Sequence, residues 1–416
     1  MRIYLVEAQA DPGQTSHAAH WIRWRGSKLG LEFVDEPTDA DVVFVTCASV
    51  RSAPKVRQAL KLGPPVVVGG GGCWEPAWVP GGVAGVCVGE GLEFLRALAG
   101  GGLDESLRLP NVWVPGEDRV VIPSIEFDWE MPPSREHGDI VRVVSSRGCP
   151  QKCLFCATGW SRQFVAHPDQ RALRRTVQAL GPRGMKLDVR LVTNDLGADE
   201  WALLPRQKVA SLRASWALKL LRTGQDLSKC ITTARIGVEG TSERLRLAVK
   251  KPISHDDLIE LCVRLTAQHV RVKCFMIAGL PGETQADWDE FEEVNAAIKR
   301  HAHRCVYWSF TAFTPEPCTP LGCLPISDEY DGLYERYRSR SLEPGRFSKR
   351  IGLLCRPAKP PGRMKDAVLK AGATEAEVRR GWMHHDNPNW RVQYYATPER
   401  LRALARHYAE RIGVML

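Results

Sequence analysis

The sequence predicts an α/β protein in which a small open domain precedes a longer parallel α/β barrel. Two observations predict this class. Short runs rich in Val and Ile alternate with segments of helical periodicity, first in residues 1–100 and again in residues 139–325. Strands that are apolar throughout, with helices between them, are typical of parallel sheets covered on both faces.

The first 100 residues predict a Rossmann-like open sheet. Strands are expected at 2–8, 40–46 and 64–69, with helices at 16–30 and 49–63. A last strand begins near residue 83 and passes through Gly89 and Gly91 into a helix. This alternation indicates a domain large enough to form its own core.

The segment 101–138 is rich in Pro, Gly and acidic residues and has little periodicity, so we expect a linker or a lid. The barrel follows in residues 139–325. Its strands are expected at 139–146, 187–193, 208–214, 231–239, 270–280 and 305–313, and its helices at 168–181, 215–224, 242–269 and 284–302. Six βα units joined by right-handed crossovers form a partial or full (β/α)6 barrel, whose chemistry lies at the carboxyl ends of the strands.

Residues 326–416 form a basic, mainly helical extension. They contain 18 Lys and Arg and 11 Asp and Glu, and so hold seven of the nine net positive charges. Binding of nucleic-acid phosphates would explain this charge, and so would a solvated arginine-rich surface. Several aromatic residues of the extension could stack on bases or pack on the barrel, among them Trp382, Trp390, Tyr394 and Tyr395.

The composition is that of an ordinary globular protein, with 44% hydrophobic and 25% charged residues. The N-terminal stretch meets an acidic residue and a proline too early for a secretory signal, and no apolar run approaches the roughly 18 residues of a membrane span. We therefore expect a cytoplasmic protein without membrane contact. Its 13 dispersed cysteines are expected to be reduced.

Three cysteines stand out because they follow the first barrel strand within eight positions. Cys149, Cys153 and Cys156 have the spacing C-x3-C-x2-C. Clustered thiolates bind zinc or an iron-sulfur cluster. A structural zinc site requires a fourth ligand, and the sequence contains no second C-x2-C pair that could supply it. A 4Fe-4S cluster on three cysteines instead leaves one iron open to a substrate or cofactor.

In this arrangement the sequence resembles the radical S-adenosylmethionine (SAM) superfamily. The resemblance rests on the cysteine run with Phe155 before its last thiol and on three further blocks, "IGVEGTSERLRLAVKKPIS", "FMIAGLPGET" and "TAFTPEPCTPL". The order and spacing are those of the branch with cobalamin-dependent methylases and tRNA methylthiotransferases. The resemblance implies that the three thiols hold a 4Fe-4S cluster whose open iron binds SAM and cleaves it reductively to a 5′-deoxyadenosyl radical.

The resemblance also implies a set of SAM contacts at the strand ends. The family commonly has a Gly-Gly-Glu-like turn after the second strand, but this sequence has "VTNDLG", so Asn194 or Asp195 would bind the SAM amino group. Arg213 and Glu239 end the third and fourth strands, where the ribose and carboxylate of SAM are expected. Gly279 would border the adenine.

Two relatives compete for the N-terminal domain. Its second half resembles the cobalamin-binding domain of radical SAM methylases, although the Asp-x-His-x-x-Gly loop is absent, and His17 and His20 are expected to be packing or surface residues. The methylthiotransferase domain holds an auxiliary cluster on three cysteines. Cys47 and Cys73 match two of them, but the third falls near Ala10, which makes this alternative the weaker one.

The leading hypothesis is a radical SAM enzyme that methylates an unactivated carbon, with a nucleic-acid base as a candidate substrate. The cofactors implied are a 4Fe-4S cluster, SAM and a cobalamin, and the implied partner is a flavodoxin- or ferredoxin-like reductant. The alternatives are a methylthiotransferase-like tRNA-modifying enzyme and a non-catalytic zinc or iron-sulfur protein.

Overall fold

The computed structural model describes residues 1–7, 17–47, 52–74, 79–117, 119–130, 133–135, 140–180, 188–192, 207–313, 319–324, 391–392 and 398–413. Most of the expected basic extension lies outside the described residues, including Trp382, Trp390, Tyr394 and Tyr395. The described helices include none that is long and apolar enough to cross a membrane.

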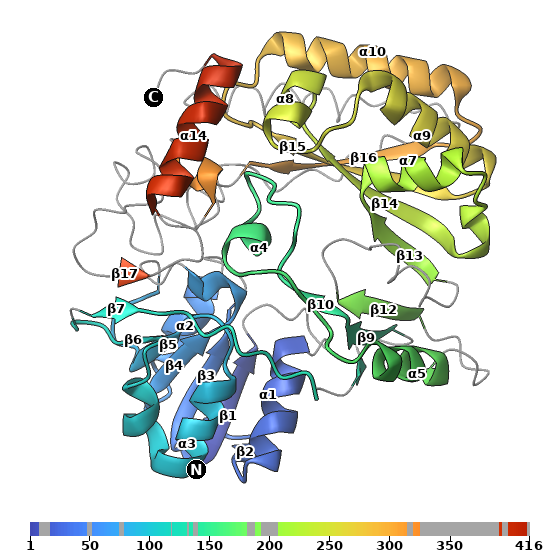
Figure 1. Ribbon diagram of the computed structural model, residues 1–416. Helices are drawn as coiled ribbons and strands as arrows, with labels where there is room; N and C mark the ends of the chain where they lie inside the picture. Colours follow the sequence, from blue (N-terminus) through green and yellow to red (C-terminus); the bar gives the residue numbers. More distant parts are fainter. Residues whose placement is uncertain are drawn as a thin grey trace.

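The N-terminal domain is a six-stranded sheet in the order β2-β1-β3-β4-β5-β6 (Figure 1). The strands are β1 (Arg2–Glu7), β2 (Glu32–Val34), β3 (Val42–Thr46), β4 (Val66–Gly69), β5 (Gly85–Cys87) and β6 (Val112–Trp113). All pairs are parallel except β5 with β6. The carboxyl ends of the parallel strands therefore share one edge.

Helices cover both faces of this sheet because its strands are apolar on both sides. The helices are α1 (His17–Lys28), α2 (Ala53–Ala59) and α3 (Leu92–Leu107). Ala19 of α1 and Phe94 of α3 share one core cluster with Phe44, whereas Val56 of α2 joins a second cluster with Val45. Burial at roughly 25 cal/mol per Å² of apolar surface is the main force that holds these layers together.

The segment expected to be a linker is partly regular. The helix α3 continues past residue 100 to Leu107, and β6 adds an antiparallel strand to the sheet. Short strands β7 (Val120–Val121) and β8 (Ser134–Arg135) follow, and β7 pairs with β17 (Arg391–Val392) near the C-terminus. Local periodicity cannot reveal strands of two residues, because their pairing partners lie far away in the sequence.

The second domain contains the six expected parallel strands. They are β9 (Ile140–Val144), β12 (Asp188–Val192), β13 (Gln207–Leu212), β14 (Ile231–Glu239), β15 (Arg271–Ala278) and β16 (Val306–Ala312). Hydrogen bonds join β9 to β12 and, separately, β13 through β16, and β8 pairs antiparallel with β9. The strands form a partial (β/α)6 barrel, as the sequence predicts.

The barrel helices are α5 (Gln170–Leu180), α7 (Ala214–Arg222), α8 (Glu243–Ala248), α9 (His255–Ala267) and α10 (Gln285–His301) (Figure 1). Helices α7, α9 and α10 share one core cluster with the strands, whereas α8 belongs to a separate cluster. The single helical stretch expected over 242–269 is two helices, because Pro252 disfavours helix in the preceding residue and Ser254 caps α9 by accepting from Asp257 N.

The C-terminal helix α14 (Pro398–Ile412) packs against the barrel. Its Tyr408 is buried and donates a hydrogen bond to the carbonyl of Pro281 at 2.9 Å. Leu401 and Ala405 pack in the same cluster as Leu321 of the short helix η6 (Pro320–Cys323). The described end of the extension therefore belongs to the barrel core.

Candidate active site at the carboxyl edge of the barrel

The three clustered cysteines lie in a loop that leaves the carboxyl end of β9. Short strands β10 (Ser146–Arg147) and β11 (Val165–Ala166) pair antiparallel at the base of this loop, and helix α4 (Ala157–Trp160) follows Cys156. Cys153 is buried, whereas Cys149 and Cys156 are partly exposed, and none of the three is in a disulfide. The loop therefore presents three thiols, none of them in a disulfide, at the carboxyl edge of the barrel.

Backbone hydrogen bonds fix the middle of the cysteine loop. The indole of Trp160 donates to the carbonyl of Cys153 at 2.8 Å. The amide of Leu154 donates to the Val249 carbonyl, and the Leu154 carbonyl accepts from Leu321 N. The loop is thus attached to the α8–α9 connection on one side and to η6 on the other.

Cys153 lies beside charged residues from two other strand ends and from the connection between α8 and α9. Its sulfur is 3.9 Å from the carbonyl oxygen of Lys250, which also accepts from the guanidinium of Arg213 at 3.4 Å. The next residue, Lys251, forms an ion pair with Glu239 at 3.4 Å. The structure therefore brings Cys153, Arg213 and Glu239 together, as expected from the sequence.

The electrostatics of this group favour anionic ligands. Burial raises the pKa of the Cys153 thiol, while the positive charges of Lys251 and Arg213 lower it. Burial likewise raises the pKa of Glu239, and Lys251 opposes that shift. Nearby cations stabilise the thiolate form that binds metals and also attract a carboxylate.

Glu239 has a left-handed backbone conformation, with φ of 71°. The register between β14 and β15 shifts at this point, between Gly237 and Glu239. Such a conformation is costly for a residue other than glycine and is frequent at functional sites. The bulge turns the last side chain of β14 toward Lys251.

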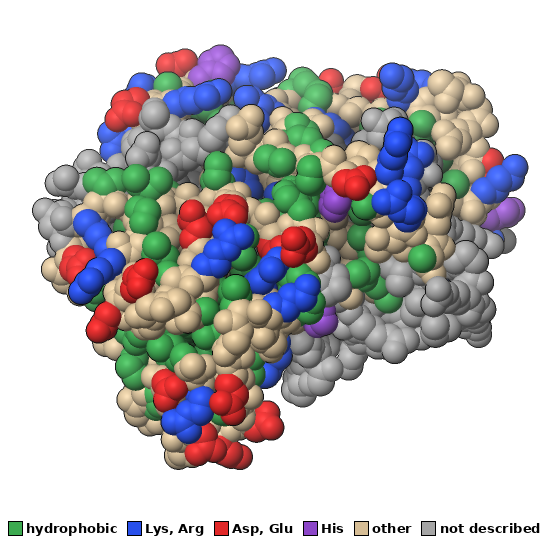
Figure 2. Space-filling model, turned by 60° about the horizontal axis from the view of Figure 1, so that its bottom comes forward, with side chains coloured by type: hydrophobic (Ala, Val, Ile, Leu, Met, Phe, Trp, Pro, Cys, Tyr) green, Lys and Arg blue, Asp and Glu red, His purple; other side chains and the backbone are tan. Residues whose placement is uncertain are grey.

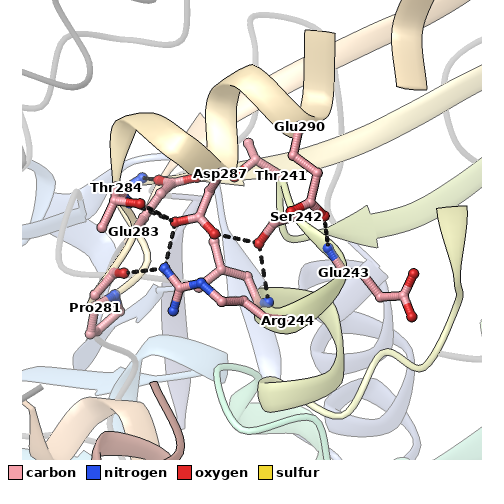
Figure 3. A network of polar contacts seen from close by, with 12 residues as sticks. Thr241, Ser242, Glu243, Arg244, Pro281, Glu283, Thr284, Asp287 and Glu290 are labelled. Atoms are coloured by element: carbon pink, nitrogen blue, oxygen red, sulfur yellow. Dashed lines mark hydrogen bonds and ion pairs between the residues drawn. The ribbon is translucent and has the colours of Figure 1, made fainter. Parts of the chain in front are cut away.

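A polar network fixes the neighbouring strand ends, β14 and β15 (Figure 3). Glu283 is buried and accepts from Thr241 Oγ1 at 2.5 Å and from the backbone amide of Gly279. Asp287 accepts from Ser242 Oγ at 2.5 Å and from Arg244 at 2.6 Å. Burial raises the pKa of Glu283 to about 7, although its hydrogen bonds oppose the shift.

The remaining predicted site residues have different outcomes. Phe155 is partly buried and packs on the cluster that contains Leu154 and Trp160, so the structure gives it a packing contact. Gly279 has φ of 79°, which its position in the turn after β15 requires. Asn194 and Asp195 lie outside the described residues.

Sequence reasoning missed Lys251. It lies in the connection between α8 and α9, so no strand-end pattern points to it. The signal in the sequence that could have revealed it is the pair of lysines in "AVKKPIS". A basic pair directly before a proline-containing turn can face the edge of the barrel.

A second hollow lies at the carboxyl edge of the N-terminal sheet. This pocket of ≈ 200 Å³ is lined by the ends of β3, β4 and β5, by α1, and by residues of the cysteine loop. Apolar and glycine residues form most of it, with Glu90, Arg147 and Arg162 on one wall and His17 on another. Burial and the charge of Arg147 lower the pKa of His17 to about 4.

Cys47 and Cys73 lie on the other side of the turn that follows β4. Both are fully buried, and their thiols hydrogen-bond to each other. Burial and this contact raise the pKa of Cys73 well above its usual range. Burial and mutual contact place these two thiols in a packing environment.

Comparison with known proteins identifies the class. Residues 143–294 match the model of the Radical SAM superfamily. The tRNA-2-methylthio-N(6)-dimethylallyladenosine synthase of Nitrosomonas eutropha is 25% identical over 348 residues, which cover 73% of this chain and 74% of that protein. The synthase of Vibrio vulnificus is 25% identical over 366 residues, which cover 77% of this chain and 73% of that protein.

Two solved structures share the fold. The radical SAM methyltransferase TsrM from Kitasatospora setae, with cobalamin and a 4Fe-4S cluster bound, matches with a TM-score of 0.57 at 14% identity, over 99% of this chain and 88% of that chain. The cobalamin-dependent SAM radical enzyme OxsB, with aqua-cobalamin and SAM bound, matches with a TM-score of 0.50 at 12% identity. This match covers 73% of this chain and 56% of that chain. The chain is therefore an enzyme, and its residues 143–294 match the Radical SAM superfamily.

Proteins of this superfamily bind a 4Fe-4S cluster and SAM. The donor set of the loop suits the cluster, because three cysteine thiols outside any disulfide are the ligands that iron-sulfur clusters use. Within the described ranges, no three His, Cys, Asp or Glu side chains stand close enough together to hold a metal ion as they are placed.

Proposed function

We propose that the enzyme is a cobalamin-dependent radical SAM methyltransferase. The observation that carries this proposal is the pocket at the edge of the N-terminal sheet, which is lined by both the sheet and the cysteine loop. A corrinoid is larger than this pocket, so one part of it would be enclosed and the rest would extend along the loop. A methyl carrier at this place would lie beside the cluster site.

The residues of the barrel edge have distinct roles in this proposal. Arg213 and Lys251 would bind the SAM carboxylate, Glu239 would accept from its ribose or amino group, and the Gly279 turn would border the adenine. When bound, the cluster supplies the electron that cleaves SAM, and a cobalamin supplies the methyl carrier. The protein orients both groups and excludes water from them.

A methylthiotransferase is the second candidate, and sequence similarity favours it. Such an enzyme needs an auxiliary cluster on the N-terminal sheet. The N-terminal domain offers Cys47 and Cys73 for two of the three ligands of that cluster, whereas the third position falls near Ala10, which has no thiol. We therefore rank the methyltransferase first.

A nucleic-acid base is the substrate that we propose, and a flavodoxin- or ferredoxin-like protein is the proposed electron donor. The support for the substrate is the basic composition of residues 326–416. On the face in Figure 2, Lys and Arg interleave with Asp and Glu, so this face offers mixed charge rather than a basic groove. Salt-dependent binding of tRNA that disappears when residues 326–397 are removed would support this substrate.

Absorbance titration with hydroxocobalamin tests the proposed function. The anaerobically reconstituted enzyme should bind one corrinoid, with a shift of the corrin bands, and should form S-adenosylhomocysteine from SAM. A fully loaded enzyme that binds no corrinoid but inserts sulfur into tRNA would overturn the proposal in favour of the second candidate.

A further inference from the structure

One carboxylate of the N-terminal domain contacts both ends of the cysteine loop. Glu90 lies in the turn between β5 and α3, and its side chain is 11% exposed. Its Oε1 accepts from Arg147 Nε at 3.0 Å and Nη2 at 2.6 Å, and also forms an ion pair with Arg162. Arg147 precedes Cys149 and Arg162 follows Cys156, so the two guanidinium groups mark the two ends of the loop.

The same three residues form one wall of the N-terminal pocket. The guanidinium of Arg147 also lies over the ring of Phe127, at 4.6 Å from its centroid, and Phe127 lines the pocket too. Any movement of the loop ends therefore changes the shape of the pocket. A ligand that presses on this wall acts on the loop in return.

The charges make Glu90 essential to this arrangement. One carboxylate faces two guanidinium groups whose side chains are 28% and 12% exposed. Without the carboxylate, two like charges would face each other in a largely desolvated place, which favours their separation. Charge-assisted hydrogen bonds of this type are also stronger than neutral ones.

We propose that Glu90 is a positioning residue that couples the N-terminal pocket to the cysteine loop. It acts through Arg147 and Arg162, so that a ligand in the pocket stabilises the cluster on the loop and the cluster strengthens binding of that ligand. This inference rests on the proposed function, because it assumes a corrinoid in the pocket.

The experiment compares Glu90→Gln with Glu93→Gln in the anaerobically reconstituted enzyme. Glu93 lies in the first turn of α3 and offers a matched loss of charge. The rate of iron release to a chelator is measured with and without saturating hydroxocobalamin. In the wild type and in Glu93→Gln, hydroxocobalamin should slow iron release, whereas in Glu90→Gln we expect about tenfold faster release and no protection.

The outcomes separate this inference from the proposed function. A wild type that binds no hydroxocobalamin overturns both. If hydroxocobalamin slows iron release equally in the wild type and in Glu90→Gln, only the role of Glu90 is overturned.

Two further variants keep the test decisive. Arg162→Gln added to Glu90→Gln should slow iron release relative to Glu90→Gln alone, because it removes one of the two like charges left facing each other; an additive increase in the release rate would contradict the inference. If Glu90→Gln lacks the far-UV circular dichroism of the wild type, Arg162→Gln alone serves as the variant. Hydroxocobalamin should no longer slow iron release from Arg162→Gln. If it slows release as much as in the wild type, the inference is overturned.

Discussion

The molecule contains two parallel sheets whose carboxyl edges differ in character. The barrel edge places charged groups side by side, with Glu239 paired to Lys251 and Arg213 close to Cys153. The edge of the N-terminal sheet is mostly glycine and apolar residues, with its charges confined to one wall. The same strand topology therefore produces two kinds of site.

The two edges suit different kinds of ligand. A charged edge suits a small zwitterion such as SAM, because each of its charges needs a partner once water is removed. An apolar edge suits a large, mostly hydrophobic surface, because burial of such a surface needs few polar contacts. Each prediction below alters one edge and compares it with the other or with a matched site.

The largest expected effect separates the cysteines of the two edges. Cys153→Ala should abolish the cluster, because two thiolates cannot replace three, whereas Cys73→Ala should leave it unchanged. Iron and sulfide content and absorbance near 400 nm measure the result. Loss of cluster from Cys73→Ala to the same degree would show that the N-terminal edge also holds iron.

The sequence predicts the barrel strands closely, because each is a long apolar run between clear helix signals. The strand expected at 231–239 is β14 with the same bounds. Candidate residues at strand ends, such as Arg213 and Glu239, follow from the same pattern, since parallel strands bring their carboxyl ends to one edge.

Other parts of the site depend on contacts that local patterns do not contain. Glu90 meets Arg147 across 57 residues of sequence, and Lys251 reaches Glu239 only because α8 ends before Pro252. The left-handed backbone at Glu239 arises from a register shift between two strands. Each of these features is fixed by tertiary packing.

The second prediction concerns the network that fixes the barrel edge (Figure 3). Asp287→Ala should destabilise the enzyme by about 3 kcal/mol, because the buried Ser242 hydroxyl loses its acceptor and α10 loses its capping box with Thr284, whereas the partly exposed Arg244 keeps the Gly282 carbonyl. Asp289→Ala on the same helix removes an exposed acceptor of Gln285 and should cost under about 0.5 kcal/mol. Urea unfolding measures both, and similar values would contradict a structural role for the network.

The third prediction is a pH dependence that arises at Glu283. Its pKa rises from 4.5 to about 7 in the folded enzyme, so the folded state binds this proton more tightly. Its contribution to stability is therefore full below pH 4.5 and is lost as the pH rises through about 7. The stability of wild type relative to Glu283→Gln should fall across this range by on the order of 3 kcal/mol. Parallel stability curves for the two proteins would disprove the assignment.

The smallest expected effect lies at the N-terminal edge. Gly70 has φ of 117°, and a Cβ atom there would stand 2.3 Å from the carbonyl oxygen of Cys47. Gly70→Ala should therefore destabilise the enzyme by about 2 kcal/mol, because backbone strain and the clash add. Gly71→Ala, where a Cβ atom meets nothing within 4 Å, is the matched control. Since the Gly70 turn borders the pocket, hydroxocobalamin affinity should fall in Gly70→Ala while the iron content stays constant. A loss of iron instead would show that the two edges depend on each other more strongly than through Glu90 alone.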